Sequence, residues 1–201
     1  MAKRLLDIVL AGGGLVVSAP LWAAIAALIK IEDGGPVFFS QERVGCRGRR
    51  FEAMKFRSMI VDAEAATGPI QAGENDPRVT RVGRVLRATA MDELPQLWNI
   101  FRGDMSFVGP RALRPGEIEV KGNGAVEKLE DVPGFSDRCA VRPGLTGVAQ
   151  IFAPRDVLRR QKFRYDRFYV DRQSFWFDVR LILLSFWITF RGRWEDRGRK
   201  L

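Results

Sequence analysis

Asp92 and Glu93 form an adjacent pair of carboxylates in the sequence Asp92-Glu93-Leu94-Pro95. Because proline is tolerated only in the first turn of a helix, the pair is expected at or beside a helix N-terminus. The partial positive charge there keeps a carboxylate ionised, and an ionised aspartate can act as a nucleophile or bind magnesium. The simpler interpretation is that both residues only cap the helix.

Four cations accompany this pair: Lys55, Arg87, Arg111 and Arg142. Arg111 follows Gly-Pro and Arg142 precedes Pro-Gly, so both are expected in rigid turns. Guanidinium and ammonium groups suit phosphate oxygens. Carboxylates, magnesium and such cations together predict phosphoryl transfer. The sequence has no Gly-x-x-x-x-Gly-Lys-Ser/Thr loop, which disfavours a P-loop nucleotidase.

Composition narrows the chemistry further. The 201 residues include no histidine, which excludes a Ser-His-Asp triad, a Cys-His pair and a zinc site with histidine ligands. The two cysteines, Cys46 and Cys139, are too few for a cysteine-only zinc site. The formal net charge of +9 suits phosphorylated substrates and anionic lipids, but also nucleic acid.

The segment from Ile8 to Ile29 contains no charged residue. A straight helix of that length is about 33 Å long, enough to cross a bilayer core of about 30 Å. Four interpretations stay open. The segment can be a signal peptide with Lys3 and Arg4 at its start, a spanning helix, a hairpin that enters and leaves by one face, or a buried helix of a soluble domain.

Pro20 and Ser18 favour the hairpin. Proline removes a backbone hydrogen bond in a helix, and breaking the segment there leaves two arms of roughly 10–12 residues, each reaching half the membrane. The Ser18 hydroxyl can satisfy a freed carbonyl. Basic residues flank the segment on both sides, and a hairpin places both sets in the cytoplasm. We predict a re-entrant membrane helix hairpin over 1–33 and a cytoplasmic catalytic domain over 34–201.

The sequence as a whole predicts a mostly helical α/β fold. Its expected parts are a helix-break-helix membrane segment, short strands and amphipathic interfacial helices. A helix over Leu181–Phe190, followed by a basic tail, is expected to lie in the headgroup region. The other expected elements are a strand at Val37–Phe39 and a turn at Gly45–Gly48 that leads into the segment 51–59. Helices are expected over 77–88 (Asp76 as N-cap), from Asp92 to Arg102 and over 157–170, and segment 115–141 is expected to be exposed.

Six stretches of the sequence follow one another along nearly the whole chain: Gly35–Gly45 (GPVFFSQERVG), Lys55–Met59 (KFRSM), Asp92–Asn99 (DELPQLWN), Gly103–Arg111 (GDMSFVGPR), Arg142–Gly147 (RPGLTG) and Tyr165-Asp166. In these stretches the chain resembles bacterial sugar transferases of the monotopic phosphoglycosyl transferase family, in their minimal form. It departs from the family's pattern at Ser18-Ala19-Pro20, at Pro110-Arg111-Ala112 and at Ile151-Phe152-Ala153, the last of which bears on which nucleotide sugar fits.

The resemblance implies that a hexose-1-phosphate moves from a UDP-sugar to undecaprenyl (polyprenyl) phosphate, with release of UMP. Asp92 would attack the phosphorus in a ping-pong reaction and carry a covalent phosphosugar. Glu93 would help to hold Mg²⁺ or position the lipid phosphate. Lys55, Arg87 and Arg111 would neutralise phosphate charge, and Pro20 would kink the re-entrant segment.

The same resemblance implies the bacterial inner membrane as location, with the catalytic domain at the cytoplasmic leaflet and no nucleic-acid partner. It leaves open whether the protein forms a homodimer. The alternative function is a basic, membrane-tethered binding protein without catalysis.

Overall fold

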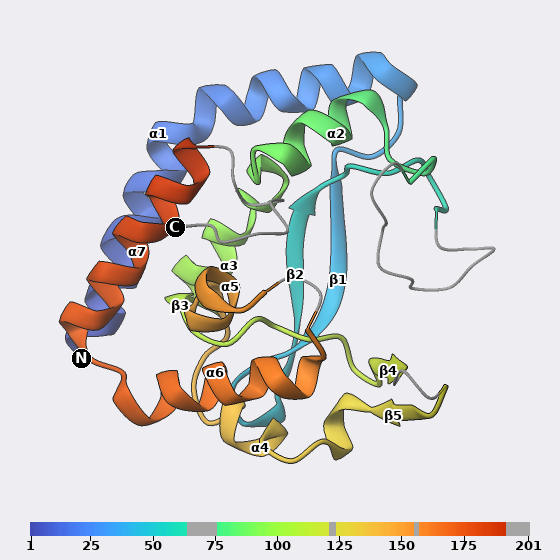
Figure 1. Ribbon diagram of the computed structural model, residues 1–201. Coiled ribbons are helices and arrows are strands. Elements are labelled where there is room, and N and C mark those ends of the chain that lie inside the picture. The colour runs from blue at the N-terminus through green and yellow to red at the C-terminus, as the bar shows by residue number, and fades with distance from the viewer. Residues whose placement is uncertain (64–75, 121–123, 155–156, 192–201) are drawn as a thin grey trace.

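The computed structural model describes residues 1–63, 76–120, 124–154 and 157–191. The expected mixed fold with mostly helical elements is confirmed. Figure 1 shows α1 and α7 along one side, the β1–β2 ribbon through the middle, and α4, α6 and the β4–β5 hairpin at the far end from α2. The helices are α1 (Ala2–Asp33), α2 (Arg81–Ala88), α3 (Gln96–Arg102), α4 (Phe135–Arg138), α5 (Val148–Phe152), α6 (Arg159–Arg172) and α7 (Phe175–Phe190). The strands are β1 (Phe38–Val44), β2 (Arg50–Phe56), β3 (Ser106–Val108), β4 (Ile118–Val120), β5 (Val126–Lys128) and β6 (Gly144–Thr146).

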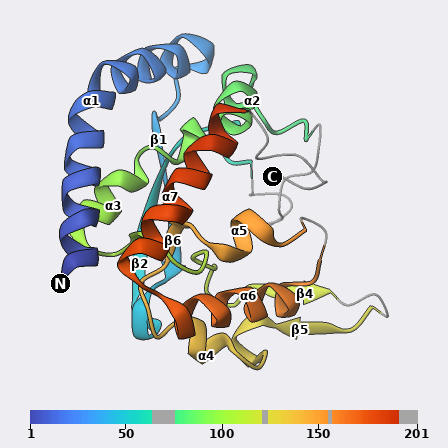
Figure 2. The same ribbon diagram turned by 60° about the vertical axis from the view of Figure 1, so that its left-hand side comes forward.

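Helix α1 is continuous but sharply bent, as Figures 1 and 2 show. The prediction that Pro20 divides the segment into two separate helices is therefore wrong. The helix continues through the proline, and Gly34 is its C-cap. Ser18 donates its hydroxyl proton to the Gly14 carbonyl at 2.6 Å, and not to the Val16 carbonyl whose usual partner Pro20 lacks. Serine bonded to its own preceding turn favours bending of a helix.

Both arms of α1 pack on the rest of the chain. Ala11 is fully buried in the main core cluster, while Ile25 and Ile29 are buried with Phe56 and Leu86 in a second one. These contacts disfavour a signal peptide that is removed. The outward face of α1 stays apolar and exposed, which disfavours a buried soluble helix; its exposed side chains include Leu5, Val9, Val16, Val17 and Ile31. Within the described residues, α1 alone is long and apolar enough to cross a membrane.

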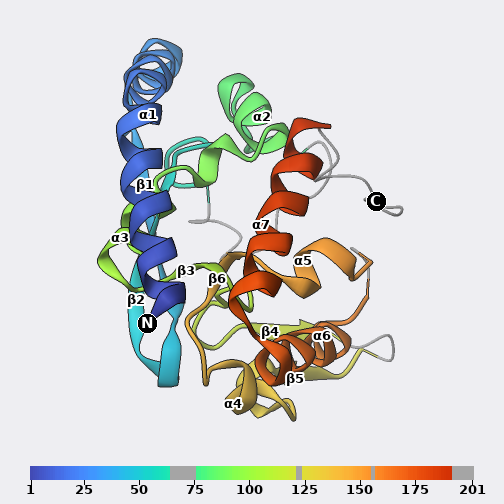
Figure 3. The same ribbon diagram turned by 90° about the vertical axis from the view of Figure 1, so that its left-hand side faces the viewer.

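Polar contacts hold the two ends of α1. Near the start, Lys3 lies 2.7 Å from the buried Asp178 of α7 and also donates to the Val108 carbonyl. Near the end, the Glu32 carboxylate accepts from the backbone amides of Arg81 and Val82, the first residues of α2. Both ends of the helix are thus attached to one folded domain (Figure 3).

The β1–β2 ribbon is antiparallel, with Phe39 opposite Lys55 and Arg43 opposite Phe51. Because side chains alternate between the faces of a strand, Arg43 and Lys55 share one face of the ribbon. The outer edge of β2 is completed by Asn99 of α3, which accepts from the Met54 amide and donates to the Glu52 carbonyl. This contact fixes α3 beside the strand that carries Lys55.

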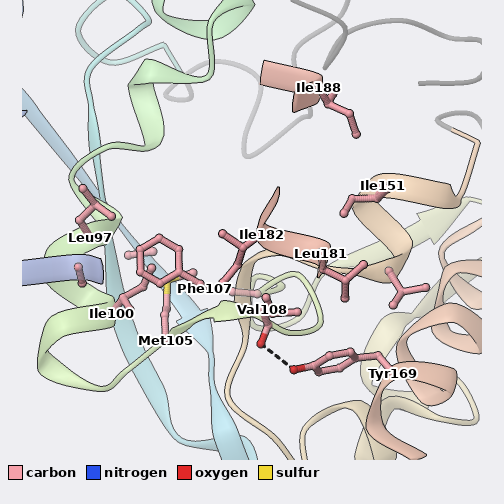
Figure 4. Packing of buried hydrophobic residues seen from close by; sticks show 14 of the residues in the cluster. Leu97, Ile100, Met105, Phe107, Val108, Ile151, Tyr169, Leu181, Ile182 and Ile188 are labelled. Atoms are coloured by element: carbon pink, nitrogen blue, oxygen red, sulfur yellow. Dashed lines mark hydrogen bonds between the residues drawn. The ribbon is translucent and has the colours of Figure 1, made fainter. Parts of the chain in front are cut away.

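The core beneath α1 and α7 surrounds the short parallel pair β3–β6 (Figure 4). Val108 and Tyr169 are 1% exposed, and the Tyr169 hydroxyl bonds the Val108 carbonyl. After β3 the chain makes a close approach to β6, since a Cβ added at Gly144 would lie 2.0 Å from the Gly109 nitrogen. This packing sets the position of the turn that presents Arg111.

Three expectations for local structure need correction. Helix α2 begins at Arg81 with Thr80 as its N-cap, not at residue 77, because the Asp76 carboxylate binds the Arg78 amide and guanidinium instead. Segment 115–141 is not an exposed excursion throughout: Leu129 and Val132 are buried in a third cluster. The C-terminal helix is longer than expected. Its basic tail beyond Arg191 lies outside the described residues.

Asp7 supplies a test of how α1 is held. Its buried Oδ1 accepts from the Ser106 hydroxyl and the Phe107 amide, both at 3.0 Å. Asp7→Ala leaves two buried donors unpaired, so we expect the free energy of unfolding to fall by about 1–3 kcal/mol. Thermal melting in detergent measures this, with Glu52→Ala on the exposed ribbon face as the control. Equal melting temperatures for the two variants would contradict the assigned role.

Candidate active site

Asp92 and Glu93 lie in a 3-10 turn, Met91–Glu93, between α2 and α3. Ala90 precedes the turn with a left-handed φ of 54°, and Pro95 is the N-cap residue of α3. The N-cap residues of the turn and of α3 are thus Ala90 and Pro95, and neither carboxylate occupies these positions. No side chain caps the turn or α3 at its N-terminus. The simpler interpretation, helix capping, is therefore wrong.

The two carboxylates have different partners. Glu93 Oε1 accepts from Lys55 Nζ at 2.6 Å and lies 3.4 Å from the Arg111 guanidinium. Asp92 Oδ2 is 3.9 Å from the same lysine, too far for a hydrogen bond, and accepts none from the described part of the chain. Asp92 is nonetheless only 8% exposed. The site thus contains one paired carboxylate and one whose oxygens are free to react.

This difference separates the two pKa values. Burial raises the pKa of Asp92 to about 6, an effect that Lys55 partly offsets and the neighbouring Glu93 charge strengthens. Burial also acts to raise the pKa of Glu93, but Lys55 and Arg111 outweigh it and hold that pKa at about 2. At neutral pH both groups are ionised, with Glu93 neutralising Lys55 and Asp92 the more basic.

The carboxylates line a cavity of about 2120 Å³. Lys55, Arg87 and Arg111 line the same cavity, so the structure brings together three of the four predicted phosphate-binding cations. It does not bring Arg142 there: that side chain is exposed, and it is not among the described residues lining the cavity. Phosphate binding by Arg142 stays a prediction without support from its position.

Arg87 reaches the site because α2 packs closely on the end of β2. A Cβ at Gly83 would lie 2.0 Å from the Ser58 carbonyl oxygen, so only glycine permits this approach. Arg87 Nε then donates to the Ser58 hydroxyl at 2.9 Å. Neither Gly83 nor Ser58 was predicted to belong to the site. The only sequence feature that could have indicated them is the position of Ser58 inside the matched stretch KFRSM.

The cavity has an apolar end. Side chains of α1 and α7 line it, and Ser18 of the bend is among them. Its lining residues from these two helices are Leu10, Gly14, Val17, Ser18 and Leu21 of α1, and Ile182, Ser185, Phe186 and Thr189 of α7. The cavity therefore joins the charged centre to the exposed apolar faces of the two helices, which suits a ligand with one charged and one hydrocarbon end.

The described residues contain no cluster of three or more acidic, cysteine or histidine side chains that could hold a metal ion by themselves. Asp92 and Glu93 supply two carboxylates at one edge of the cavity. Magnesium typically takes one or two carboxylates and completes its shell with water and substrate phosphates. The pair fits that mode of binding.

Comparison with known proteins agrees with these features. A sequence model of the family described as "Bacterial sugar transferase" matches residues 1–192. The exopolysaccharide production protein ExoY of Rhizobium meliloti (strain 1021) is 38% identical over 196 residues, which cover 90% of this chain and 82% of the relative. The exopolysaccharide production protein PSS of Rhizobium leguminosarum bv. phaseoli is 40% identical over 185 residues, covering 90% of each chain.

Longer relatives match as well. The UDP-glucose:undecaprenyl-phosphate glucose-1-phosphate transferase of Escherichia coli (strain K12) is 40% identical over 197 residues, covering 96% of this chain but 40% of the relative. The chain thus spans less than half the length of such relatives. Because the matching family consists of transferases, the comparison favours an enzyme over the alternative, a binding protein without catalysis. The match over nearly the whole sequence and these identities show that the chain belongs to the bacterial sugar transferases and is an enzyme of the phosphoglycosyl transferase family.

Proposed function

We propose that this enzyme transfers a hexose-1-phosphate from a UDP-sugar to undecaprenyl phosphate, releasing UMP, at the start of exopolysaccharide assembly. The observation that carries the proposal is the buried Asp92, which accepts no hydrogen bond from the described residues and lies beside three cations in a cavity with an apolar end. The names of the relatives supply the two substrates and the exopolysaccharide product.

The reaction proceeds in two displacements. An Asp92 oxygen attacks the sugar-bearing β-phosphorus, and the bond from that phosphorus to the bridging oxygen breaks, so that UMP leaves with the electron pair. The lipid phosphate oxygen then attacks the same phosphorus and releases the Asp92 carboxylate. Lys55, Arg87 and Arg111 would neutralise the phosphate oxygens as charge develops, and their shared lining of the cavity supports this role.

A covalent intermediate suits the two substrates, because one arrives from water and the other from the membrane. Glu93 is not the better nucleophile, since its Oε1 is engaged by Lys55 and Arg111. Its role is to keep Lys55 in place beside Asp92. Mg²⁺, held by Asp92 and Glu93, would neutralise donor phosphate charge when bound.

We also propose that α1 enters the cytoplasmic leaflet of the bacterial inner membrane and returns to the same face. The support is that Lys3 at one end and Glu32 at the other both bind the catalytic domain. A helix that spans the bilayer would place one of those ends on the far side. The exposed aromatic side chains of α7, such as Trp176 and Trp187, suit the headgroup region beside it.

The nucleophile is tested by Asp92→Asn, which keeps the shape of the side chain and removes its charge. We expect turnover with a UDP-sugar and undecaprenyl phosphate to fall on the order of 10³-fold or more, with an unchanged circular dichroism spectrum. Intact-mass spectrometry of the normal enzyme with the UDP-sugar alone should show a phosphosugar adduct on Asp92. Near-normal turnover by the asparagine variant would exclude Asp92 as nucleophile.

The pKa of Asp92 predicts a pH profile. Attack requires the ionised carboxylate, and its pKa is raised to about 6. The initial rate of UMP release should therefore be level above that pH and fall about tenfold per unit below it. Lys55→Met removes a cation that lowers this pKa, so the midpoint should move upward. A rate independent of pH between 5 and 8 would show that Asp92 does not limit the reaction.

Topology is tested by labelling single cysteines placed at the exposed ends of α1. Ala2→Cys and Ile31→Cys are made separately after Cys46 and Cys139 are replaced by serine. A maleimide that cannot cross membranes should modify both positions in inside-out vesicles and neither in intact cells. Modification of the two positions from opposite sides would establish a spanning helix instead.

A further inference from the structure

Arg43 lies in the first of the matched sequence stretches, Gly35–Gly45, and is not among the residues of the proposed reaction. Its guanidinium is largely buried and lines the cavity. It donates to the Ala112 carbonyl at 3.1 Å and to the side-chain oxygen of Gln41. Within the described residues, no carboxylate lies within 4.0 Å of it. A buried positive charge is thus held by neutral acceptors.

The charged groups that act on Arg43 are two arginines, Arg111 and Arg114, and two glutamates, Glu117 and Glu93, so the five groups together carry one excess positive charge. The pKa of Arg43 is lowered to about 10, mainly by burial and then by the charges of Arg111 and Arg114, with only partial compensation by Glu117 and Glu93. All five groups line the same cavity. Like charges gathered in a partly dehydrated site are costly unless an anion joins them.

The ribbon register brings Arg43 toward the reacting groups. Arg43 and Lys55 are on one face, and Phe39, which is opposite Lys55, is four residues from Arg43, or about 13 Å along the strand. Their long side chains shorten that separation: a small cavity of about 20 Å³ is lined by Arg43, Lys55, Glu93 and Arg111 together. Arg43 is therefore the next cation along the ribbon from the lysine that holds the carboxylate pair.

We infer that Arg43 binds the α-phosphate of the nucleotide donor, and hence the phosphate of the UMP that leaves. This inference rests on the proposed function. Lys55 and Arg111 both bind Glu93, whereas no carboxylate of the described residues lies within 4.0 Å of Arg43. The leaving UMP gains negative charge on its phosphate, and a guanidinium binds such a group through two parallel hydrogen bonds.

The test measures UMP binding without turnover, by titration calorimetry in an Asp92→Asn background. Arg43→Gln can still donate to the Ala112 carbonyl but loses the charge, and we expect UMP to bind about 10- to 100-fold more weakly. Arg43→Lys should recover part of that loss. The matched control is Arg50→Gln: Arg50 is on the opposite face of the same ribbon, exposed and paired with Glu42, so binding should stay within about twofold.

A second measurement separates charge from folding. If Arg43→Gln melts at a lower temperature, its weaker binding could reflect a folding defect. A third variant, Arg43→Ala, is then titrated with UMP in the presence of added guanidinium ion, which replaces the missing charge. The ion should strengthen UMP binding to Arg43→Ala but not to the Arg50→Gln control. Equal UMP affinity for the arginine and glutamine forms would overturn the inference and leave the proposed reaction standing. Absence of UMP binding in the Asp92→Asn background itself, with Arg43 intact, would count against the proposed function.

Discussion

Attachment of both ends of α1 to one domain is the constraint from which the rest of the architecture follows. A straight helix of 32 residues is about 48 Å long. Lys3 binds Asp178 and the Val108 carbonyl, while Glu32 binds the first amides of α2. The helix can satisfy both sets of contacts only if it bends, and Pro20 weakens it where bending is needed. The contacts at its ends also reach the elements that carry the active site: β3 leads to Arg111, and α2 carries Arg87.

The active site depends on an unequal division of one cation between two adjacent carboxylates. Lys55 is within hydrogen-bonding distance of Glu93 and beyond it for Asp92. Burial raises the pKa of both carboxylates, but the charges and hydrogen bonds of Lys55 and Arg111 outweigh it only at Glu93, and this separates the pKa values of the pair. Glu93 becomes a fixed counter-charge, and Asp92 is the more basic carboxylate, which accepts no hydrogen bond from the described residues. The sequence Asp-Glu could have assigned these roles either way.

The cavity would explain how one site serves the two dissimilar substrates of the proposed reaction. Its charged part suits the phosphates that the donor and the lipid have in common, and its lining by α1 and α7 suits a hydrocarbon chain. The exposed apolar faces of the same helices give the molecule a surface that favours a membrane over water. The binding of Arg43 to neutral acceptors fits the same scheme, since a charge that Glu117 and Glu93 compensate only in part is available to a phosphate.

Much of this protein could be predicted from its sequence, because the evidence was local. The charge-free segment, the proline within it and the carboxylate pair before Leu94-Pro95 are short-range patterns, and family motifs recur in order along the chain. Local patterns also misled. Asp76-Pro77 looked like a helix start, but Asp76 binds Arg78 and the helix begins at Arg81. The fold class, the long apolar N-terminal helix and the chemical types at the candidate site were thus determined by sequence alone.

Only the tertiary structure decided which side chains meet. Arg87 reaches the cavity because Gly83 lets α2 pack against Ser58, and Arg43 does so because strand register places it on the face of Lys55. Arg142 looked equivalent to Arg111 in the sequence, yet its side chain is exposed and is not among the described residues that line the cavity. These outcomes depend on contacts between residues far apart in the chain. Pattern and spacing along a sequence do not carry that information, because it arises only when the elements pack together.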